Sequence, residues 1–130
     1  VAGHRLSTGA MEEVIASHLD IAECAVVGKT DPLKGQLPLG FFVPNDGANR
    51  DAAELERELI SLVRAKIGAV AAFKCALEVK RLPKTRSGKI LRGTVQKIAD
   101  GQSYKMPAAI DDPAILDEIT DALSARNLIG

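Results

Sequence analysis

The fold is decided by residues 73–92, which read FKCALEVKRLPKTRSGKILR. Apolar and mostly polar side chains alternate over the first eight positions, a period of two that predicts a half-buried β-strand. Residues 81–88 carry proline, glycine and basic side chains, which is typical of a connecting loop. Lys89 then opens a predicted helix that Gly101 ends. The inward face of this helix consists of Ile90, Leu91, Val95 and Ile98.

The residues before this unit predict a helix and two short strands. Thr8 is the expected N-cap of a helix whose apolar face recurs at helical spacing. That face consists of Met11, Val14, Ile15, His18 and Leu19. Short apolar runs at 24–27 and 39–43 predict two buried strands, separated by a turn at 31–35.

Two more helices are expected. Asp51 and Glu54 have capping-box spacing at the start of one helix, and Gly68 ends it. Asp112 is the expected N-cap of the last helix, with Pro113 at its first helical position. Helices mixed with few strands predict an α+β domain, in which helices cover a small mixed sheet.

Composition limits the functional classes. The chain of 130 residues is 46% apolar but only 3% aromatic, so its core is expected to consist mainly of aliphatic side chains. The formal net charge is zero, which gives the chain no overall preference for nucleic acid or for a membrane. No apolar run could span a bilayer, and no signal peptide is visible. Cys24 and Cys75 lack CxxC spacing and are predicted to be reduced thiols on strands, with Cys75 facing the core, in a cytoplasmic protein.

Lys89 is the first candidate for chemistry. A lysine presented by a loop after a Ser-Gly pair can place a point charge on an anion at the mouth of an active site. The plain alternative is a solvated lysine at a helix start, which the helix dipole disfavours. Gly88-Lys89 is not a phosphate-binding P-loop, because that loop needs a glycine where Pro83 stands and a Ser or Thr where Ile90 stands.

The run at 82–92 closely resembles the lysine motif near the C-terminus of acyl-CoA synthetases in the adenylate-forming superfamily. Residues 1–8, VAGHRLST, resemble the same family's glycine motif, which follows the hinge between its large and small domains. The resemblance reaches from Val1 to about Gly101 and implies that residues 1–103 are the mobile small domain. The chain opens inside the glycine motif and not at a methionine, so we expect a large N-terminal domain before it.

The resemblance implies roles for four residues. Lys89 is implied to contact the carboxylate substrate and the ribose and phosphate oxygens of the nucleotide during adenylation. Gly3 is implied to line the tunnel for the pantetheine arm of CoA, and Arg5 to reach the nucleotide phosphate. Arg64 lies in a segment similar to the one where acetyl-CoA synthetases place an arginine near the CoA nucleotide. A turn glycine, a surface arginine and a solvated helix arginine are the plain alternatives for these last three.

The implied reaction is that of an AMP-forming ligase. A carboxylate and ATP give an acyl-adenylate and pyrophosphate, and after the small domain swings, the CoA thiol displaces AMP. Mg²⁺ is expected to accompany ATP with its ligands in the large domain. No metal site is expected here, because His4 and His18 stand fourteen residues apart with no Cys or carboxylate grouped around them. His18 is instead expected to be a satisfied core histidine.

Residues 104–130 resemble the C-terminal extension of propionate–CoA ligases, which indicates a short-chain carboxylate substrate. An exposed catalytic lysine is also open to acetylation, so we expect a lysine acetyltransferase and a deacetylase to act on Lys89. The acyl pocket of this family lies in the large domain, so the particular acid is not encoded in these residues.

Two other functional classes stay open. One is the small domain of an adenylation enzyme that loads a carrier protein, which shares the lysine motif. The other is a non-enzymatic basic binding module, suggested by the basic residues of 80–92. Nucleic-acid binding would favour aromatic side chains among these charges, and none occur between Phe73 and Tyr104.

Overall fold

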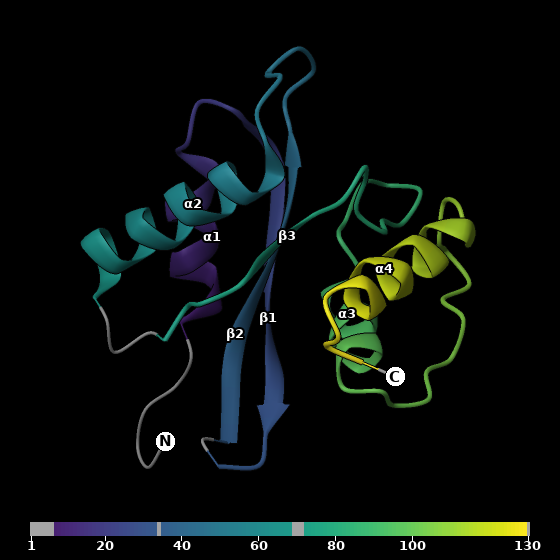
Figure 1. Ribbon diagram of the computed structural model, residues 1–130. Coiled ribbons are helices and arrows are strands. Elements are labelled where there is room, and N and C mark those ends of the chain that lie inside the picture. The colour runs from purple at the N-terminus through teal and green to yellow at the C-terminus, as the bar shows by residue number, and fades with distance from the viewer. Residues whose placement is uncertain (1–6, 34, 69–71, 130) are drawn as a thin grey trace.

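The computed structural model describes residues 7–33, 35–68 and 72–129. Figure 1 shows its strands side by side, with helices on either side of them. In chain order the helices and strands are α1 (Thr8–Ala16), β1 (Ile21–Asp31), β2 (Gly35–Pro44), α2 (Ala52–Ile67), β3 (Ala76–Glu78), α3 (Arg92–Ala99) and α4 (Ala114–Ala125).

The strands form one mixed sheet in the order β1-β2-β3. β1 and β2 are an antiparallel hairpin in which Val26 pairs with Gly40, and β3 joins β2 in parallel through Gly40 and Ala76. The predicted α+β class, with a small mixed sheet covered by helices, is confirmed.

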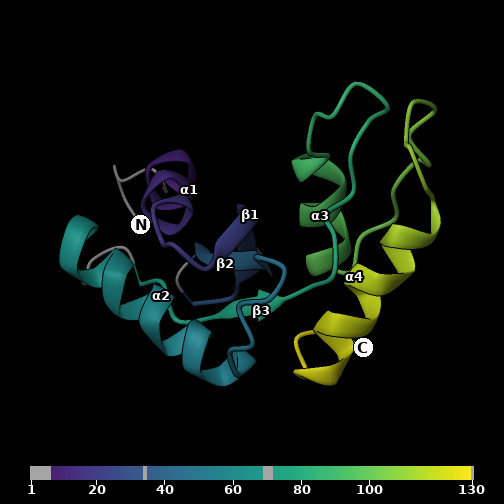
Figure 2. The same ribbon diagram turned by 90° about the horizontal axis from the view of Figure 1, so that it is seen from above.

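Both faces of this sheet are buried. Figure 2 shows α1 and α2 against one face, and α3 and α4 against the other. Successive side chains of a strand point to opposite faces, so Val26 lies in the core under α1 and α2 while Val27 lies in the core under α3 and α4. Phe42 likewise lies in the core under α1 and α2 and Phe41 in the core under α3 and α4, and neither is more than 1% exposed. This is why the strands read as continuous apolar runs.

Gly40 lets the α1–α2 core close over β2. A Cβ placed on Gly40 would lie 2.8 Å from the ring carbon Cζ of Phe73 and 3.5 Å from the Cβ of Ala76. The ring therefore occupies the space that a side chain at position 40 would need.

The predicted strand at 73–80 is shorter in the structure. Only Ala76–Glu78 form β3, and Ala72 before them has a φ of +55°. Ala76, expected on the polar side, is 2% exposed because the α1–α2 core covers that face. Cys75 is half-buried and packs against the α3–α4 core. The alternation holds from Cys75 to Val79, but Phe73 lies with Ala76 in the α1–α2 core, and the assumption of one solvated face was wrong.

The N-terminal helix differs from its prediction at both ends. Ser7 is the N-cap in place of Thr8, and α1 ends at Ala16. Leu19 lies beyond this end and is 91% exposed, so its predicted place in the core is wrong. His18 is satisfied at the edge of the core, where its Nε2 lies 2.8 Å from Glu58 Oε1 and its Nδ1 accepts the backbone N–H of residue 20.

The ends of the later helices follow the predictions more closely. Asp51 is the N-cap of α2 and Gly68 its C-cap, with a φ of +111° at Gly68. The capping box does not form, because Asp51 makes no side-chain cap bond and Glu54 pairs with Arg50 instead. At α4 the carboxylate of Asp112 accepts the N–H of residue 114 at 3.0 Å, one residue ahead of the N-cap at position 113.

Within the described residues, no helix has both the length and the apolar character needed to cross a bilayer.

Candidate functional site: an exposed lysine on a closed loop

Lys89 lies on a hairpin that its own hydrogen bonds close, and not at the start of a helix. We call residues 83–91 the lysine loop. The N–H of Leu91 donates to the carbonyl of Pro83 at 2.9 Å, and the N–H of Thr85 donates to the carbonyl of Lys89 at 2.8 Å. Because the backbone groups at 89 and 91 are used in this way, α3 begins only at Arg92 and the predicted helix start was wrong.

The tight turn at the tip of the lysine loop depends on the hydroxyl group of Thr85 and on the glycine at position 88. The hydroxyl Oγ1 of Thr85 accepts the N–H of Lys89 at 3.1 Å and lies 2.9 Å from Ser87 Oγ. Gly88 has a φ of +95°, and its N–H donates to the carbonyl of Thr85 at 2.9 Å. A positive φ of this size is rarely adopted by residues with a Cβ, which accounts for glycine before the lysine.

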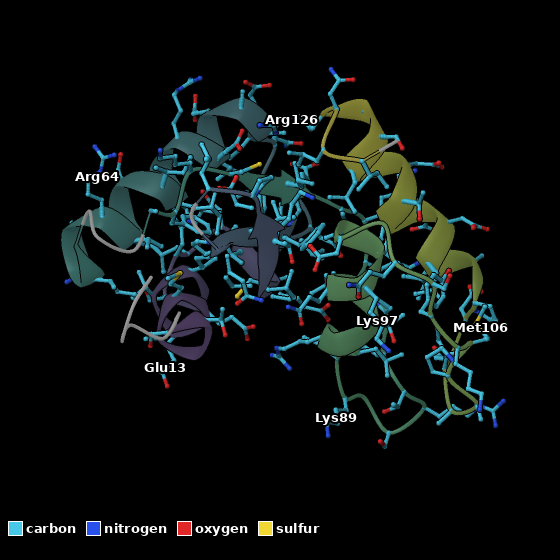
Figure 3. All side chains as sticks on the ribbon, turned by 90° about the horizontal axis from the view of Figure 1, so that it is seen from below. Glu13, Arg64, Lys89, Lys97, Met106 and Arg126 are labelled. Carbon is cyan, nitrogen blue, oxygen red and sulfur yellow. The ribbon has the colours of Figure 1, made fainter. Side chains whose placement is uncertain are left out.

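The side chain of Lys89 is exposed. Figure 3 shows it extending outward from the end of the lysine loop. In the part of the chain that the structure describes, Lys89 makes no ion pair, unlike three of its basic neighbours. Its ammonium group can therefore contact an anion without first breaking an ion pair to a described carboxylate.

Those three neighbours are held by acidic side chains. Arg81 pairs with Asp112 at 2.9 Å and with Glu118 at 2.6 Å, and Lys84 pairs with Glu23. Arg92, the first residue of α3, forms a fork with Glu12. Half of the six basic residues at 80–92 are therefore neutralised, and the run is not a uniform cationic face.

The C-terminal segment also holds the lysine loop. The N–H of Arg86 donates to the carbonyl of Ala109, and the N–H of Asp111 donates to the carbonyl of Lys84, each at 2.9 Å. Ile110 between them is 4% exposed and belongs to the α3–α4 core. The division at residue 104 into domain and extension stays a prediction, although this segment packs with the residues before it.

Glu12 connects the lysine loop to the opposite side of the sheet. Its carboxylate accepts the N–H of Val26 at 2.9 Å and both Nε and Nη2 of Arg92, at 2.8 and 2.6 Å. The side chain of Glu12 is 15% exposed. This carboxylate raises the pKa of the Arg92 guanidinium above its ordinary value. Burial, and then the charge of Glu12, raises the pKa of the nearby Cys24 thiol to about 11.

No local sequence pattern connects Glu12 to the lysine loop. A hollow lies between α1 and the lysine loop, and its lining combines carboxylates with Lys84 and two glycines. The lining residues are Gly9, Glu12, Glu13, Ala16, Glu23, Cys24, Lys84, Gly88 and Ile90. The only signal in the sequence was an acidic residue among the apolar positions of α1, which a solvated helix face would also show.

The other predicted site residues are not gathered around Lys89. Arg64 is exposed on α2 and lines a small hollow with Gly68 and Phe73. Figure 3 places Arg64 and Lys89 at opposite sides of the molecule. Gly3 and Arg5 lie outside the described residues.

Among the residues described, no three His, Cys, Asp or Glu side chains are grouped so that they could hold a metal ion.

The mixed sheet with a helical layer on each face, together with the exposed lysine on its loop, defines a small domain of the acyl-CoA synthetase type. Acetoacetyl-CoA synthetase from Streptomyces lividans shares the fold, with a TM-score of 0.72 at 20% identity, over 92% of this chain and 18% of that one. An acyl-CoA synthetase from Brucella canis matches with a TM-score of 0.67 at 33% identity, over 73% of this chain and 17% of that one. The chain belongs to the family described as AMP-binding enzyme C-terminal domain, whose model matches residues 10–89.

Several curated proteins are similar along nearly the whole chain. An uncharacterized protein of Pseudomonas aeruginosa is 59% identical, over 97% of this chain and 20% of its own length. The human mitochondrial acyl-CoA synthetase short-chain family member 3 is 49% identical, over 95% of this chain and 18% of its own. Propionate–CoA ligase of Escherichia coli is 45% identical, over 95% of this chain and 20% of its own length. The chain thus spans about a fifth of the length of the curated relatives it matches.

Proposed function

We propose that this chain is the C-terminal domain of an AMP-forming short-chain acyl-CoA ligase, and that Lys89 is its adenylation lysine. The observation that carries the proposal is the exposed ammonium group of Lys89, held on a closed loop near three basic residues that are already paired, Arg81, Lys84 and Arg92. The similarity to acyl-CoA synthetases along nearly the whole chain supports the reaction class.

In the first half-reaction, a carboxylate oxygen of the acid attacks the α-phosphate of ATP, and pyrophosphate leaves. Both reactants are anions, so a cation between them offsets their repulsion and stabilises charge that develops on the phosphoryl oxygens. Lys89 Nζ supplies this cation without taking or giving a proton. Arg5 is proposed to contact the nucleotide phosphate.

In the second half-reaction, the sulfur of CoA attacks the acyl carbon and AMP leaves. Gly3 is proposed to line the tunnel for the pantetheine arm, and Arg64 to lie near the CoA nucleotide. Lys89 and Arg64 lie on opposite sides of the domain (Figure 3), so one rigid orientation would not bring both to a single small site. Their separation supports a domain that turns between the two half-reactions.

The finer parts of the proposal concern substrate, setting and regulation. Propionate is the proposed acid, because the Escherichia coli relative carries that name. ATP and CoA are the co-substrates, and Mg²⁺ is proposed to enter with ATP on ligands of the large N-terminal domain. The cytoplasm is the proposed location, although several relatives are named as mitochondrial. Acetylation of Lys89 by an acetyltransferase, reversed by a deacetylase, would switch adenylation off by removing the charge.

The decisive experiment separates the half-reactions in the full-length enzyme. Lys89→Ala should lower ATP–pyrophosphate exchange about a hundred- to a thousand-fold, the usual cost of a preorganised electrostatic contact. The same variant should convert supplied propionyl-adenylate and CoA to thioester at close to the normal rate. Gly3→Leu should show the reverse, because its side chain would fill the pantetheine path.

Equal loss of both half-reactions in both variants would contradict separate roles for Lys89 and Gly3. Two further measurements extend the test. The chain of residues 1–130 alone should fold without forming adenylate, and adenylate formation by this chain would refute the two-domain proposal. Full-length enzyme with stoichiometric acetyl-Lys89 should lose pyrophosphate exchange and regain it after deacetylation, and retained exchange would exclude the regulatory role.

A further inference from the structure

The lysine loop is attached to the rest of the domain at both of its ends by ion pairs. Lys84 near its start pairs with Glu23 of β1, and Arg92 just after its end pairs with Glu12 of α1. Of the two carboxylates, that of Glu12 is the more buried, with its side chain 15% exposed against 34% for Glu23. Surface ion pairs contribute little, so the partly buried fork is the stronger constraint.

We propose that Glu12 is a positioning residue for Lys89, which sets the lysine loop through a two-bond fork to Arg92. The inference rests on the proposed adenylation role of Lys89. Glu12 acts only through the guanidinium at the first residue of α3.

The carboxylate of Glu12 is itself fixed. Its Oε2 accepts the N–H of Val26 at 2.9 Å, and Val26 is a β1 residue that is 1% exposed. On either side of it in α1, Met11 and Ile15 are each 1% exposed in the α1–α2 core. Glu12 can therefore act as a rigid reference point against which the guanidinium is held.

The position of Arg92 is passed on to Lys89 over a short, bonded path. Only two residues separate them, and the next N–H toward the loop, that of Leu91, closes the hairpin onto Pro83 at 2.9 Å. A guanidinium held at two atoms of one carboxylate cannot rotate freely, unlike one held at a single atom. Loss of the fork would leave the loop formed but let its tip shift, and misplacement by about 1 Å can cost on the order of a hundred-fold in rate.

The chain contains a matched control for this residue. Glu56 of α2 is 14% exposed, accepts a strand N–H from Ala76 at 2.9 Å, and binds the guanidinium of Arg126 at 3.2 and 3.1 Å. It has the same chemistry and burial as Glu12, but its fork ends after α4 and not at the lysine loop. A purely structural loss should therefore be alike at both positions.

The test uses the full-length enzyme with Glu12→Gln and Glu56→Gln. A glutamine can still accept the strand N–H, but it offers one oxygen where the fork needs two. We expect similar decreases in melting temperature for both variants. Glu12→Gln should lower pyrophosphate exchange by at least tenfold at saturating substrates, with thioester formation from supplied propionyl-adenylate within twofold of normal. Glu56→Gln should leave both half-reactions within twofold.

A second readout separates positioning from general damage. If Glu12 acts through Lys89, adding Glu12→Gln to Lys89→Ala should cause no further loss of pyrophosphate exchange. Arg92→Lys keeps the charge but cannot form the fork, so it should reproduce the defect in pyrophosphate exchange. This variant tests the inference if Glu12→Gln does not fold.

Normal exchange in Glu12→Gln and Arg92→Lys, an equal defect in Glu56→Gln, or an additive loss on Lys89→Ala would each overturn the inference. Its failure can be told apart from failure of the proposed function. Normal exchange in Lys89→Ala overturns both, whereas a defect in Lys89→Ala with normal exchange in Glu12→Gln overturns the inference alone.

Discussion

Gly88→Ala in the full-length enzyme should impair adenylation without any steric clash. Nothing lies within 4 Å of a Cβ built on Gly88, so the added methyl group has room. The cost arises from the backbone, because Gly88 has a φ of +95°. A residue with a Cβ pays about 1–2 kcal/mol to occupy the left-handed region.

The lysine loop can respond to this backbone strain in two ways, and both lower the rate of adenylation. If the lysine loop keeps its shape, the strain appears as lost stability of the formed loop. If the loop relaxes, the hydrogen bond from Gly88 to Thr85 is lost and Lys89 moves with the tip. In either case the population of the competent loop falls by a factor of about 5 to 30 for 1–2 kcal/mol.

The assay is pyrophosphate exchange, with thioester formation from supplied acyl-adenylate as its internal reference. Gly47→Ala is the matched control, because Gly47 has a φ of +80° and equally open space but lies between β2 and α2. We expect a 5- to 30-fold loss of exchange in Gly88→Ala only. Exchange within twofold of normal in Gly88→Ala would refute the argument that the shape of this loop positions the lysine.

Three further predictions concern the rest of the domain. Gly40→Ala should lower the free energy of unfolding by about 1–3 kcal/mol in a urea titration, since its Cβ would meet a buried ring at 2.8 Å; an unchanged midpoint would contradict this packing. Burial and a neighbouring carboxylate raise the pKa of the Cys24 thiol to about 11. An alkylating reagent should therefore modify Cys24 of the folded protein slowly at pH 8 and faster as the pH approaches 11, and rapid labelling at pH 8 would disprove the raised pKa. Hydrogen bonds to His18 and then to Arg50 lower the pKa of Glu58 below its ordinary value of 4.5. The contribution of Glu58 to folding stability should therefore be complete above pH 4.5 and be lost as the pH falls further. Glu58→Gln should flatten this part of the acid-unfolding curve, and an unaltered curve would exclude a stabilising role for the Glu58 carboxylate.

The sequence predicted the fold class because the helix signals are local. Asp51 and Gly68 mark the ends of α2 in the chain and in the structure alike. The strands were harder to bound, because a ladder of backbone hydrogen bonds can extend a strand beyond its buried part. β1 continues to Asp31, well past the apolar run at 24–27, since its last residues pair with the start of β2.

The lysine could be singled out from the sequence, but its surroundings could not. The lysine loop is closed by its own backbone hydrogen bonds and a threonine hydroxyl. It is also held by backbone groups of Ala109 and Asp111, and these contacts are not visible in a local pattern. The basic run suggested a binding module because its acidic partners lie far away in the chain. Glu12 is 80 residues from Arg92, and no periodicity connects positions so distant.

The burial of both sheet faces has a consequence for how the domain opens in solution. Adjacent residues of β1, such as Val26 and Val27, belong to different cores, so the β1–β2 hairpin is shared by two helical layers. One layer can detach while the other still covers the strands. In native-state amide hydrogen exchange, the amides that join β1 to β2 should therefore exchange only through global unfolding, whereas that of Val26, which donates to Glu12 of α1, should exchange with the α1–α2 layer. The amides of α1 and α2 should form one faster cooperative unit, and those of α3 and α4 another.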